Sequence, residues 1–432
     1  MRRALRHRAR VLCQVLICLL IAASGCAPDM ALLPTPEPIT LRFGYSRDVV
    51  ELQPLFDAFQ EQNPSITIEP VEIRRWTVSG KTWLQTMELD AFRDNRQALG
   101  FAQQGLLRRL DGVQLGDWAD IQDDYYRGTW EGLAIEGEQW GVPAALDTMV
   151  CYVNMDRARA LGVDVPDGGD WSLFDFTELA IKMTPPETSY QEEGGSSFGF
   201  CTEANGYDPI VFIYLHGGKI VDNINSPTKV FLDDPLTVEA VQWYSDLTNR
   251  YGIVPDPKVI KSTFRRWGIY EAEFRGTCGI WLGWYGSRAG GGTPRTWSFD
   301  WKILPLPQEG EAFGLGDVEG YFITQESAHP KEALQLIRFL SDHWEAVGEK
   351  LPPRRSLVAS ADYQESVSKE VSTVVETLPD NMMIMPGELS ESMQRVGMVL
   401  QSAVTEIVSE DLDAAQVLAE AQRQARSTFE SP

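Results

Sequence analysis

Hydrophobic and polar positions form short blocks along the chain that change between a period of two and a period near four. Residues from Leu41 (LRFGYS) follow the pattern of a strand, and apolar positions at Leu52, Leu55, Phe56 and Phe59 follow that of a helix. Apolar residues resume at 66–73 as a second strand. A strand, a crossover helix and a strand in such close succession predict an α/β unit with parallel strands.

The same change of period continues through the rest of the chain. Strand-like runs recur at 149–153, 198–201, 279–282, 301–304 and 321–324. Helical spacing recurs at Leu334, Ile337, Leu340 and Trp344, and again at Met393, Val396, Leu400, Val404 and Ile407. Regular mixing of the two element types predicts an α/β fold class for the whole body.

The first residues have the pattern of a secretory leader. Five arginines precede an apolar stretch at 11–23, and small residues follow it up to Gly25. The apolar stretch is shorter than the roughly 20 residues that a helix needs to cross a bilayer. We therefore expect residues 1–25 to be removed as a signal peptide.

The residues around Cys26 indicate an anchor and a spacer. Ala23-Ser24-Gly25-Cys26 resembles a lipobox, whose cysteine is lipidated and becomes the first residue of the mature protein. An ordinary signal peptidase site after Gly25 is the alternative. Residues 26–39 are rich in proline and read as an extended tether. The predicted location is the extracytoplasmic face of the cell membrane, in the periplasm or at the cell surface.

Charge and cysteine content narrow the possible functions. The chain has a formal net charge of −24, which becomes −29 without the five leader arginines. Such an acidic chain repels phosphate backbones, so nucleic-acid binding is excluded. Cys151, Cys201 and Cys278 remain in the body, each in an apolar run. One disulfide is possible among them, but all three cannot pair with one another.

The order of motifs resembles the family 1 extracellular solute-binding proteins of bacterial ABC importers, the group that includes maltose-binding protein. The most specific block is residues 125–163, where EGEQWGVP is followed by Asp147 and then by CYVNMD. Weaker blocks follow in family order: HGGKIVD (216–222), DDPLTVEAVQWYSDL (233–247), FRGTCGIWLGWYG (274–286), WKILPLP (301–307), EGYFITQESAHPKEALQLIRFLSD (319–342) and LPPRRS (351–356). The chain departs from the family at TCGI and near residues 81–100, where the usual strand is poorly formed.

This resemblance implies a two-lobed, type II-like periplasmic-binding-protein fold with a ligand cleft between the lobes. We expect crossings between lobes near residues 147–150, 281–285 and 342–350. The N-terminal lobe would then comprise 40–147 plus 284–342, and the C-terminal lobe 148–283 plus 343–432. The resemblance also implies that the protein is not an enzyme, needs no cofactor, is a monomer, and delivers a small solute, a carbohydrate by preference, to permease subunits in the membrane.

A sugar offers apolar C–H faces and a ring of hydroxyls, so its receptor needs flat aromatic surfaces and polar side chains. In the family, the turn after the GIWL strand commonly supplies a stacking residue, which here is Trp284 or Tyr285. The alternative for both is packing at the hinge. Alternation along the strand assigns Trp281 to the core.

Two acidic residues are candidate acceptors for sugar hydroxyls. Asp147 lies where the chain leaves the first lobe, and a carboxylate there can accept two hydroxyl hydrogen bonds. Glu319 precedes a predicted strand, in a loop resembling one that lines the family's cleft. A surface or helix-capping role for Asp147 and a solvated loop position for Glu319 are the alternatives.

Other candidate ligand contacts come from loops. Arg354 and Arg355 could grip hydroxyls or a carboxylate, or could form an ion pair between lobes. Trp76, Tyr45 and Tyr207 lie beyond predicted strands, where open α/β sheets place ligands, and packing is the alternative for each.

Paired carboxylates among aromatic residues also occur in glycoside hydrolases. The sequence has no His-Glu-x-x-His, no Gly-x-Ser-x-Gly and no Walker loop, and its few histidines are too scattered to predict a metal site. A glycoside-active enzyme is thus a remote alternative. The nearer alternative is the same receptor role with a polyamine, a phosphate ester, iron or a peptide as the solute.

Overall fold

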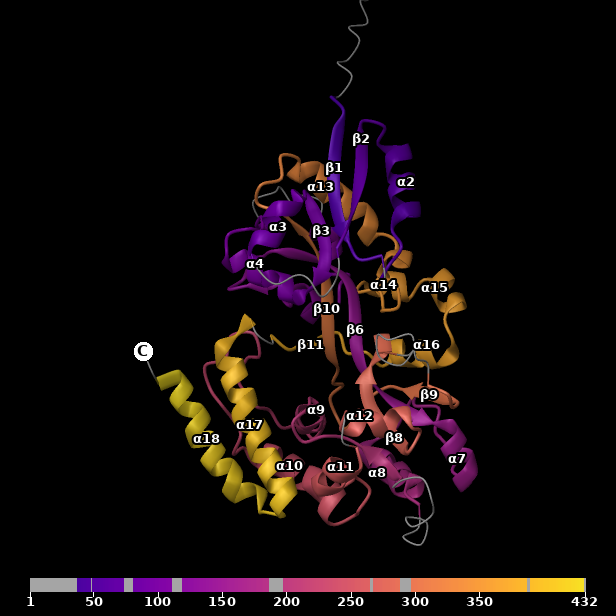
Figure 1. Cartoon of the computed structure of the whole chain (residues 1–432), viewed down its shortest axis with the longest axis vertical. Helices are drawn as coiled ribbons and strands as arrows, with labels where there is room; N and C mark the ends of the chain where they lie inside the picture. The colour runs from indigo at the N-terminus through magenta and orange to yellow at the C-terminus, as the bar shows by residue number, and fades with distance from the viewer. Residues whose placement is uncertain are drawn as a thin grey trace, which may run out of the picture.

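The computed structural model describes residues 37–47, 49–73, 81–110, 119–185, 197–264, 267–287, 297–386 and 389–430, which form two halves stacked along the long axis of the molecule (Figure 1). The predicted leader, Cys26, most of the tether and Trp76 lie outside these ranges. No helix in these ranges is long and apolar enough to cross a bilayer.

One mixed sheet runs through both halves, with strand order β2-β1-β3-β10-β6-β8-β7, β11 beside β10 and β9 beside β6. The strands are β1 (Ile39–Tyr45), β2 (Ile66–Glu72), β3 (Ala91–Asn95), β6 (Gly141–Asn154), β7 (Phe198–Cys201), β8 (Cys278–Trp284), β9 (Trp301–Leu304), β10 (Leu315–Ile323) and β11 (Met383–Ile384). β1 is parallel to β2 and β3, and β7 is parallel to β8. β10 is antiparallel to β3 and β6, and β6 is antiparallel to β8 and β9. The predicted α/β fold class is confirmed.

β6 is the strand that both halves share. All 14 of its residues are buried, as expected for an almost unbroken apolar run covered on both faces. Its residues up to Thr148 pair with β10, whereas Met149 onward pair with β8 and β9. This change of partner lies at the first predicted crossing, 147–150.

The second crossing lies in β10, so its predicted position at 281–285 is wrong. β8 ends beside β6, where Trp284 pairs with Met149, and β9 then returns to the same half of β6. β10 then pairs with Thr148 of β6 near its start and with β3 near its end, so it takes the chain from the second half into the first. Residues 284–342 therefore do not all belong to the N-terminal lobe, since β9 lies in the second half. The sequence could not show this, because a short apolar run does not reveal which strand it will pair with.

The third crossing comes later in the chain than 342–350. Leu351 forms an isolated bridge with Leu146, and the backbone N–H of Tyr126 donates to the carbonyl of Pro353 over 3.1 Å. Both contacts hold this segment against the first half. The chain reaches the second half only along α15 (Ala361–Ser366) and α16 (Lys369–Glu376), where α16 packs against β9.

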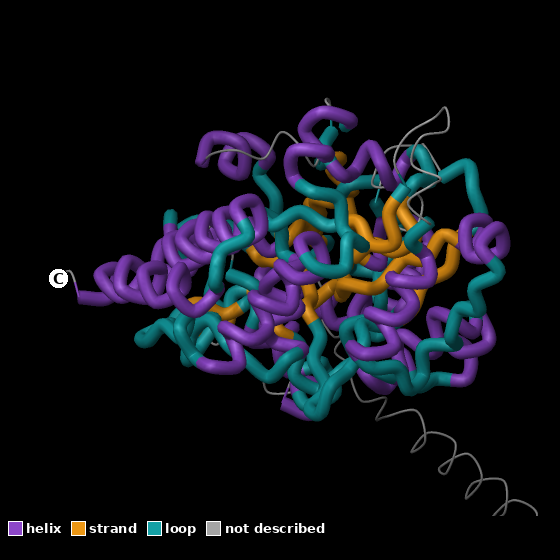
Figure 2. The backbone as a smooth tube through the Cα atoms, turned by 90° about the horizontal axis from the view of Figure 1, so that it is seen from below, coloured by secondary structure: helices purple, strands orange, loops and turns teal. Residues whose placement is uncertain are grey.

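Helices cover the sheet of the first half. For the molecule as a whole, Figure 2 shows the strands enclosed by helices and loops. The helices are α2 (Gln53–Gln62), α3 (Lys81–Met87), α4 (Gly100–Gln103), α5 (Ala119–Gln122), α6 (Arg127–Glu131), α13 (Pro330–Ser341) and α14 (Arg355–Val358). Pro54 lies in the first turn of α2, where its missing N–H costs nothing, and Phe56 and Phe59 face the core. β4 (Ala134–Ile135) and β5 (Glu138–Gln139) form a hairpin whose two turn residues have positive φ, as a type I′ turn requires.

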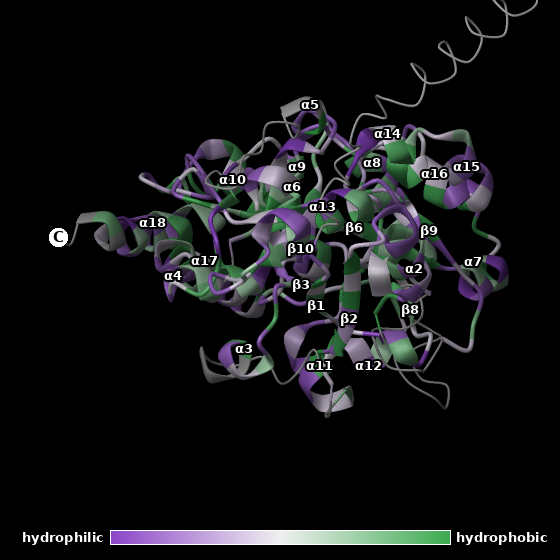
Figure 3. Cartoon of the chain, turned by 90° about the horizontal axis from the view of Figure 1, so that it is seen from above, coloured by the Kyte–Doolittle hydropathy of each residue, from purple (hydrophilic) through white to green (hydrophobic). Residues whose placement is uncertain are grey.

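The second half is mostly helical. Its helices are α7 (Met155–Leu161), α8 (Leu173–Met183), α9 (Asp208–Leu215), α10 (Pro235–Asn249), α11 (Pro257–Thr263), α12 (Ile269–Phe274), α17 (Glu391–Glu410) and α18 (Ala414–Glu430). Ser172 and Asp175 form a capping box that begins α8. α17 and α18 lie side by side and carry both hydrophobic and hydrophilic residues, as amphipathic helices on a core do (Figures 1 and 3).

The cysteines divide into a pair and a single thiol. Cys201 at the end of β7 forms a disulfide with Cys278 at the start of β8, and Cys151 is free and buried in β6. Burial raises the pKa of the Cys151 thiol well above its ordinary value. The disulfide therefore joins the two strands that lead into the cavity described below.

Thiol titration tests this assignment on protein that begins at residue 27. The native protein should not react with an aromatic disulfide reagent, because Cys151 is buried and held as the unreactive thiol. In denaturant one thiol per chain should react, and three after reduction. Three reactive thiols in denaturant without reductant would rule out the Cys201–Cys278 bond.

Candidate ligand-binding site

A cavity of about 740 Å³ opens on the second half, near the edge of the sheet where β7 and β8 end. Parallel strands bring their carboxyl ends to one edge, where the following loops can surround a ligand. We call this cavity the cleft. Its described lining residues are Met149, Tyr152, Cys201, Thr202, Glu203, Asn205, Gly206, Tyr207, Asp208, Trp267, Ile269, Tyr270, Glu273, Phe274, Trp281, Leu282, Gly283, Trp284, Ser287 and Trp297. Its volume falls in the range of about 300–1,000 Å³ typical of small-molecule sites.

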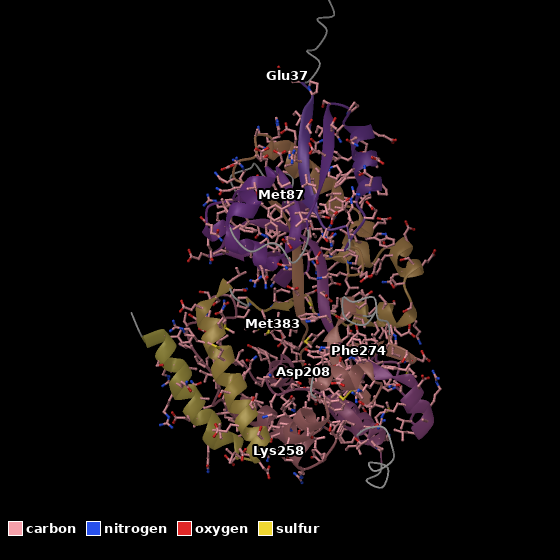
Figure 4. The ribbon with its side chains drawn as sticks, in the orientation of Figure 1. Glu37, Met87, Asp208, Lys258, Phe274 and Met383 are labelled. Atoms are coloured by element: carbon pink, nitrogen blue, oxygen red, sulfur yellow. A yellow bond between two sulfur atoms is a disulfide. The ribbon has the colours of Figure 1, made fainter. Side chains whose placement is uncertain are left out.

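Several chain segments build the cleft. The loop after β7 runs into α9 and contributes Asp208, which lies in the lower half of Figure 4. The segment entering α12 ends at Phe274, which the same view labels. The end of β8 supplies the third wall, and β6 lies beneath it with Met149 and Tyr152.

Aromatic side chains with free surface line the cleft. Tyr207, Trp267 and Tyr270 are 43%, 44% and 61% exposed, which is unusual for large apolar rings. Trp284 is partly exposed, and its ring meets that of Tyr207 edge to face with centroids 6.3 Å apart. The hydroxyl of Tyr152 donates to the Trp284 carbonyl over 2.7 Å and so fixes the end of β8. These rings offer flat surfaces for a solute to stack on.

Three carboxyl groups line the same cavity. The hydroxyl of Thr202 donates a hydrogen bond to the Asp208 carboxylate over 2.6 Å. The backbone N–H of Ile269 donates one to the Glu203 carboxylate over 2.9 Å. Burial, reinforced by the nearby charge of Glu203, raises the pKa of Asp208 to about 7. Burial, with the charges of Asp208 and Glu203, also raises the pKa of Glu273 well above its ordinary value. The described lining includes no lysine, arginine or histidine.

Two of the residues predicted from the sequence, Trp284 and Tyr207, lie in the cleft wall. Tyr285, the neighbour of Trp284, is buried with other apolar residues, as the alternative of hinge packing expected. Trp281 is buried, as predicted, and its inner edge also lines the cleft. Tyr45 is fully buried against Phe56 in the core of the first half, which leaves it no surface for a ligand in this structure.

Asp147 and Glu319 belong to a buried cluster where β6 and β10 cross between the halves. We call this set, Arg93, Asp147, Asp317, Glu319 and Lys350, the hinge charge cluster. The Arg93 guanidinium lies 2.7 Å from the Glu319 carboxylate, and the Lys350 ammonium lies 3.1 Å from Glu319 and 3.6 Å from Asp147. Asp317 pairs directly with Asp147 in the strand register. Basic side chains are thus placed among two buried acids, Asp147 and Glu319, and the partly buried Asp317.

Protonation in the hinge charge cluster follows from burial and these neighbours. Burial raises the pKa of Asp317, and Lys350 opposes the rise. Burial lowers the pKa of Lys350, but Glu319, Asp147 and Asp317 together outweigh burial, so that its pKa is raised. Lys350 is therefore held as the ammonium ion at neutral pH.

Asp147 also connects the hinge charge cluster to the cleft. The backbone N–H of Gly286 donates to its carboxylate over 2.9 Å, which fixes the turn after Trp284. A Cβ at Gly286 would lie 2.8 Å from the same carboxylate, so a larger residue there would displace the Asp147 side chain. Asp147 thereby positions the β8 wall.

The two predicted arginines lie away from the cleft lining. Arg354 pairs with Asp124 over 2.7 Å and with Asp342, all of which belong to the first half or its edge. Arg355 pairs with Asp380 at the surface over 3.1 Å. In this structure both guanidinium groups serve ion pairs of the protein itself.

The sequence reasoning missed the acidic residues of the loop after β7 and the whole contribution of α12. A usable signal was present in the segment WGIYEAEF, where Trp267, Tyr270 and Phe274 follow helical spacing and Glu273 adds a carboxyl group. Glu203 and Asp208 directly follow the FGFC strand, which is where α/β sheets place ligands.

Known proteins resemble this chain in sequence and in fold. Residues 46–343 match the family model described as bacterial extracellular solute-binding protein. An uncharacterized lipoprotein in the oleD 5′ region of Streptomyces antibioticus is 29% identical over 189 residues, which span 41% of this chain and 40% of that relative. The chain thus spans well under half the length of the curated relative that it matches.

Solved structures share the fold over nearly the whole chain. A cyclo/maltodextrin-binding protein complexed with maltotetraose superposes with a TM-score of 0.69 at 15% identity, over 92% of this chain and 99% of that one. UgpB from Mycobacterium tuberculosis, in complex with glycerophosphocholine, gives a TM-score of 0.64 at 18% identity, over 92% and 99%. The predicted two-lobed solute-binding fold is confirmed.

The hinge charge cluster yields a stability prediction. The side chains of Arg93 and Glu319 are only 2% and 3% exposed, so Arg93→Met removes one of the two basic partners of a buried carboxylate and leaves it with Lys350. The expected loss in the free energy of unfolding is about 3–5 kcal/mol, measured by denaturant titration. Arg355→Met is the matched control, because its pair with Asp380 is 44% and 83% exposed and should cost about 1 kcal/mol or less. Similar losses in the two variants would contradict the role given to Arg93.

Proposed function

This chain belongs to the bacterial extracellular solute-binding proteins of ABC transporters, and we propose that its own solute is a carbohydrate bound in the cleft. The family and its structural neighbours are binding proteins rather than enzymes. We extend this to the chain itself, which acts by binding and release without a catalytic step.

The observation that supports a sugar is the aromatic wall. Tyr207, Trp267, Tyr270 and Trp284 present ring surface to one cavity. Rings that remain exposed inside a concave site are costly unless a ligand covers them, and the C–H faces of a pyranose match their flat shape. The neighbouring cyclo/maltodextrin-binding protein was solved with maltotetraose, which agrees with this solute class.

Polar groups at the cleft can direct sugar hydroxyls. Asn205 and Ser287 each offer a donor and an acceptor, and Glu203 offers carboxylate oxygens. Charged acceptors form stronger hydrogen bonds than neutral ones. Apolar stacking with a few directional polar groups is the usual composition of a small-molecule site.

Solute capture involves closure of the two lobes about β6 and β10. These strands form the continuous connection between the halves, and the hinge charge cluster lies where they cross. A solute that contacts both lobes stabilises the closed form by its greater affinity for that form. The closed protein then docks on the permease subunits of the importer.

The N-terminal residues complete this proposal. Cys26 carries the lipid that holds the protein at the extracytoplasmic face of the membrane, and residues 26–39 act as the tether. The related Streptomyces antibioticus protein is described as a lipoprotein, which supports the anchor. The receptor works as a monomer beside its permease.

A phosphate ester is the second candidate, since UgpB was solved with glycerophosphocholine. A phosphate group needs basic side chains or a cluster of N–H donors. The described lining of the cleft offers carboxyl groups in their place. The carbohydrate is therefore the better-supported solute.

Removal of one ring tests the aromatic wall. A thermal-shift panel of mono- and oligosaccharides first identifies the sugar, which at about 100 times its Kd stabilises the folded state by about 2.7 kcal/mol. Trp284→Ala should weaken the affinity for that sugar at least about tenfold, or about 1.4 kcal/mol, because stacking area is lost.

Phe174→Ala is the matched control, since Phe174 is 73% exposed on α8 and is not part of the cleft lining. It should leave the affinity unchanged in isothermal titration. Unchanged affinity in Trp284→Ala as well would contradict the proposal that the sugar binds in this cavity.

A further inference from the structure

Three acidic side chains line the cleft, without a basic residue in its described lining. Glu203 and Asp208 come from the loop after β7, and Glu273 comes from α12 across the same cavity. Burial is the main cause of the raised pKa of Glu273, and the charges of Asp208 and Glu203 raise it further. Such a cluster in a poorly solvated site is unfavourable unless something compensates it.

Protein groups compensate this charge only in part. Asp208 accepts one hydrogen bond from Thr202, and Glu203 accepts one from the backbone of Ile269. Within the described ranges, the Glu273 carboxyl group has neither a hydrogen bond nor an ion pair, although protein surrounds it and its residue lines the cavity. Glu273 is thus a partly buried acid of the cavity lining with no side-chain partner among the residues that the structure describes.

A metal ion does not explain the cluster. In the part of the chain that the structure describes, no group of three or more histidine, cysteine, aspartate or glutamate side chains is arranged to hold one. The three carboxyl groups come from two segments of the lining, the loop after β7 and α12, where the nitrogen of an organic cation could donate to more than one of them.

The aromatic wall suits the same kind of ligand. Trp267, Tyr270, Tyr207 and Trp284 line the cavity that holds the acids. An ammonium group is attracted to the face of an aromatic ring by about 0.5–2 kcal/mol, more where water is excluded. Acidic oxygens and ring faces around one cavity are the combination that recognises an amine.

We propose that the solute carries a protonated amine, bound by Glu203, Asp208 and Glu273 and covered by the rings of the cleft. This inference rests on the proposed function and narrows it to an amino sugar. A neutral sugar can also donate to these carboxyl groups, whereas a cation in addition stabilises their ionised forms against the protonated forms that burial favours. The raised pKa of Asp208 and that of Glu273 agree, because burial and neighbouring acids disfavour the ionised forms, which a bound cation would favour.

The test uses the full chain purified in detergent and isothermal titration at pH 7.5. The probes are glucosamine, galactosamine and their β-1,4 oligomers, the N-acetylated form of each, the corresponding neutral sugars, and spermidine. At least one amino sugar should bind at least about tenfold more tightly than its N-acetylated form. Glu273→Gln should weaken that binding at least about tenfold, and thermal unfolding of the empty variant confirms that it is folded.

Glu271→Gln is the matched control, because Glu271 lies on the same helix but pairs with Arg275 and is not part of the cleft lining. It should leave the affinity for the amino sugar unchanged.

The possible outcomes separate this inference from the proposed function. Tight binding of a neutral or N-acetylated sugar that Glu273→Gln does not weaken overturns the amine and leaves the carbohydrate role intact. Binding of spermidine without any sugar supports the amine and overturns the carbohydrate role. Failure of every amine in the panel to bind overturns the inference.

Discussion

The structure depends on one buried strand that both halves of the molecule share. β6 pairs first with β10 and then with β8 and β9, and none of its residues reaches solvent. Backbone groups in such a strand must all find partners, since an unpaired buried N–H or C=O is costly. The halves are therefore joined through a strand that belongs to both, and charged groups buried beside it must be paired. The hinge charge cluster meets that second requirement, with Lys350 and Arg93 placed among the acids.

The same arrangement positions the cleft. β7 and β8 are parallel neighbours, so their carboxyl ends meet at one edge, and the disulfide joins the two strands. Asp147 extends the hinge to this edge by accepting from the backbone of Gly286, just beyond Trp284. A shift at the crossing strands would consequently move the β8 wall of the cleft. The cleft itself combines exposed rings with carboxyl groups that lack basic partners in its described lining, and both features are unfavourable until a solute covers them.

The periodicity of the sequence was sufficient to predict the buried strands β7, β8 and β9, because continuous apolar runs between turn residues have few other uses. It was not sufficient to predict which strand each would pair with, and so the second and third crossings were misplaced. Among site residues, Trp284 could be predicted because it ends a strand, and Tyr207 because it lies in the loop after one. Asp147 and Glu319 were recognised as important acids, but their partners lie far away in the sequence, and a carboxylate that binds a ligand and one that joins a buried ion-pair cluster look alike in sequence. Glu273 was missed because its role depends on how α12 packs against the loop after β7, which no local pattern reveals.

The measurement that most directly tests the central account is small-angle X-ray scattering of the protein with and without its solute at saturation. If the two lobes close about β6 and β10 around a solute in the cleft, the radius of gyration should fall on binding, and it should not fall when a non-binding sugar of similar size is added. An unchanged radius at confirmed saturation would contradict closure about the shared strand and would leave the cleft as a rigid binding site on one lobe.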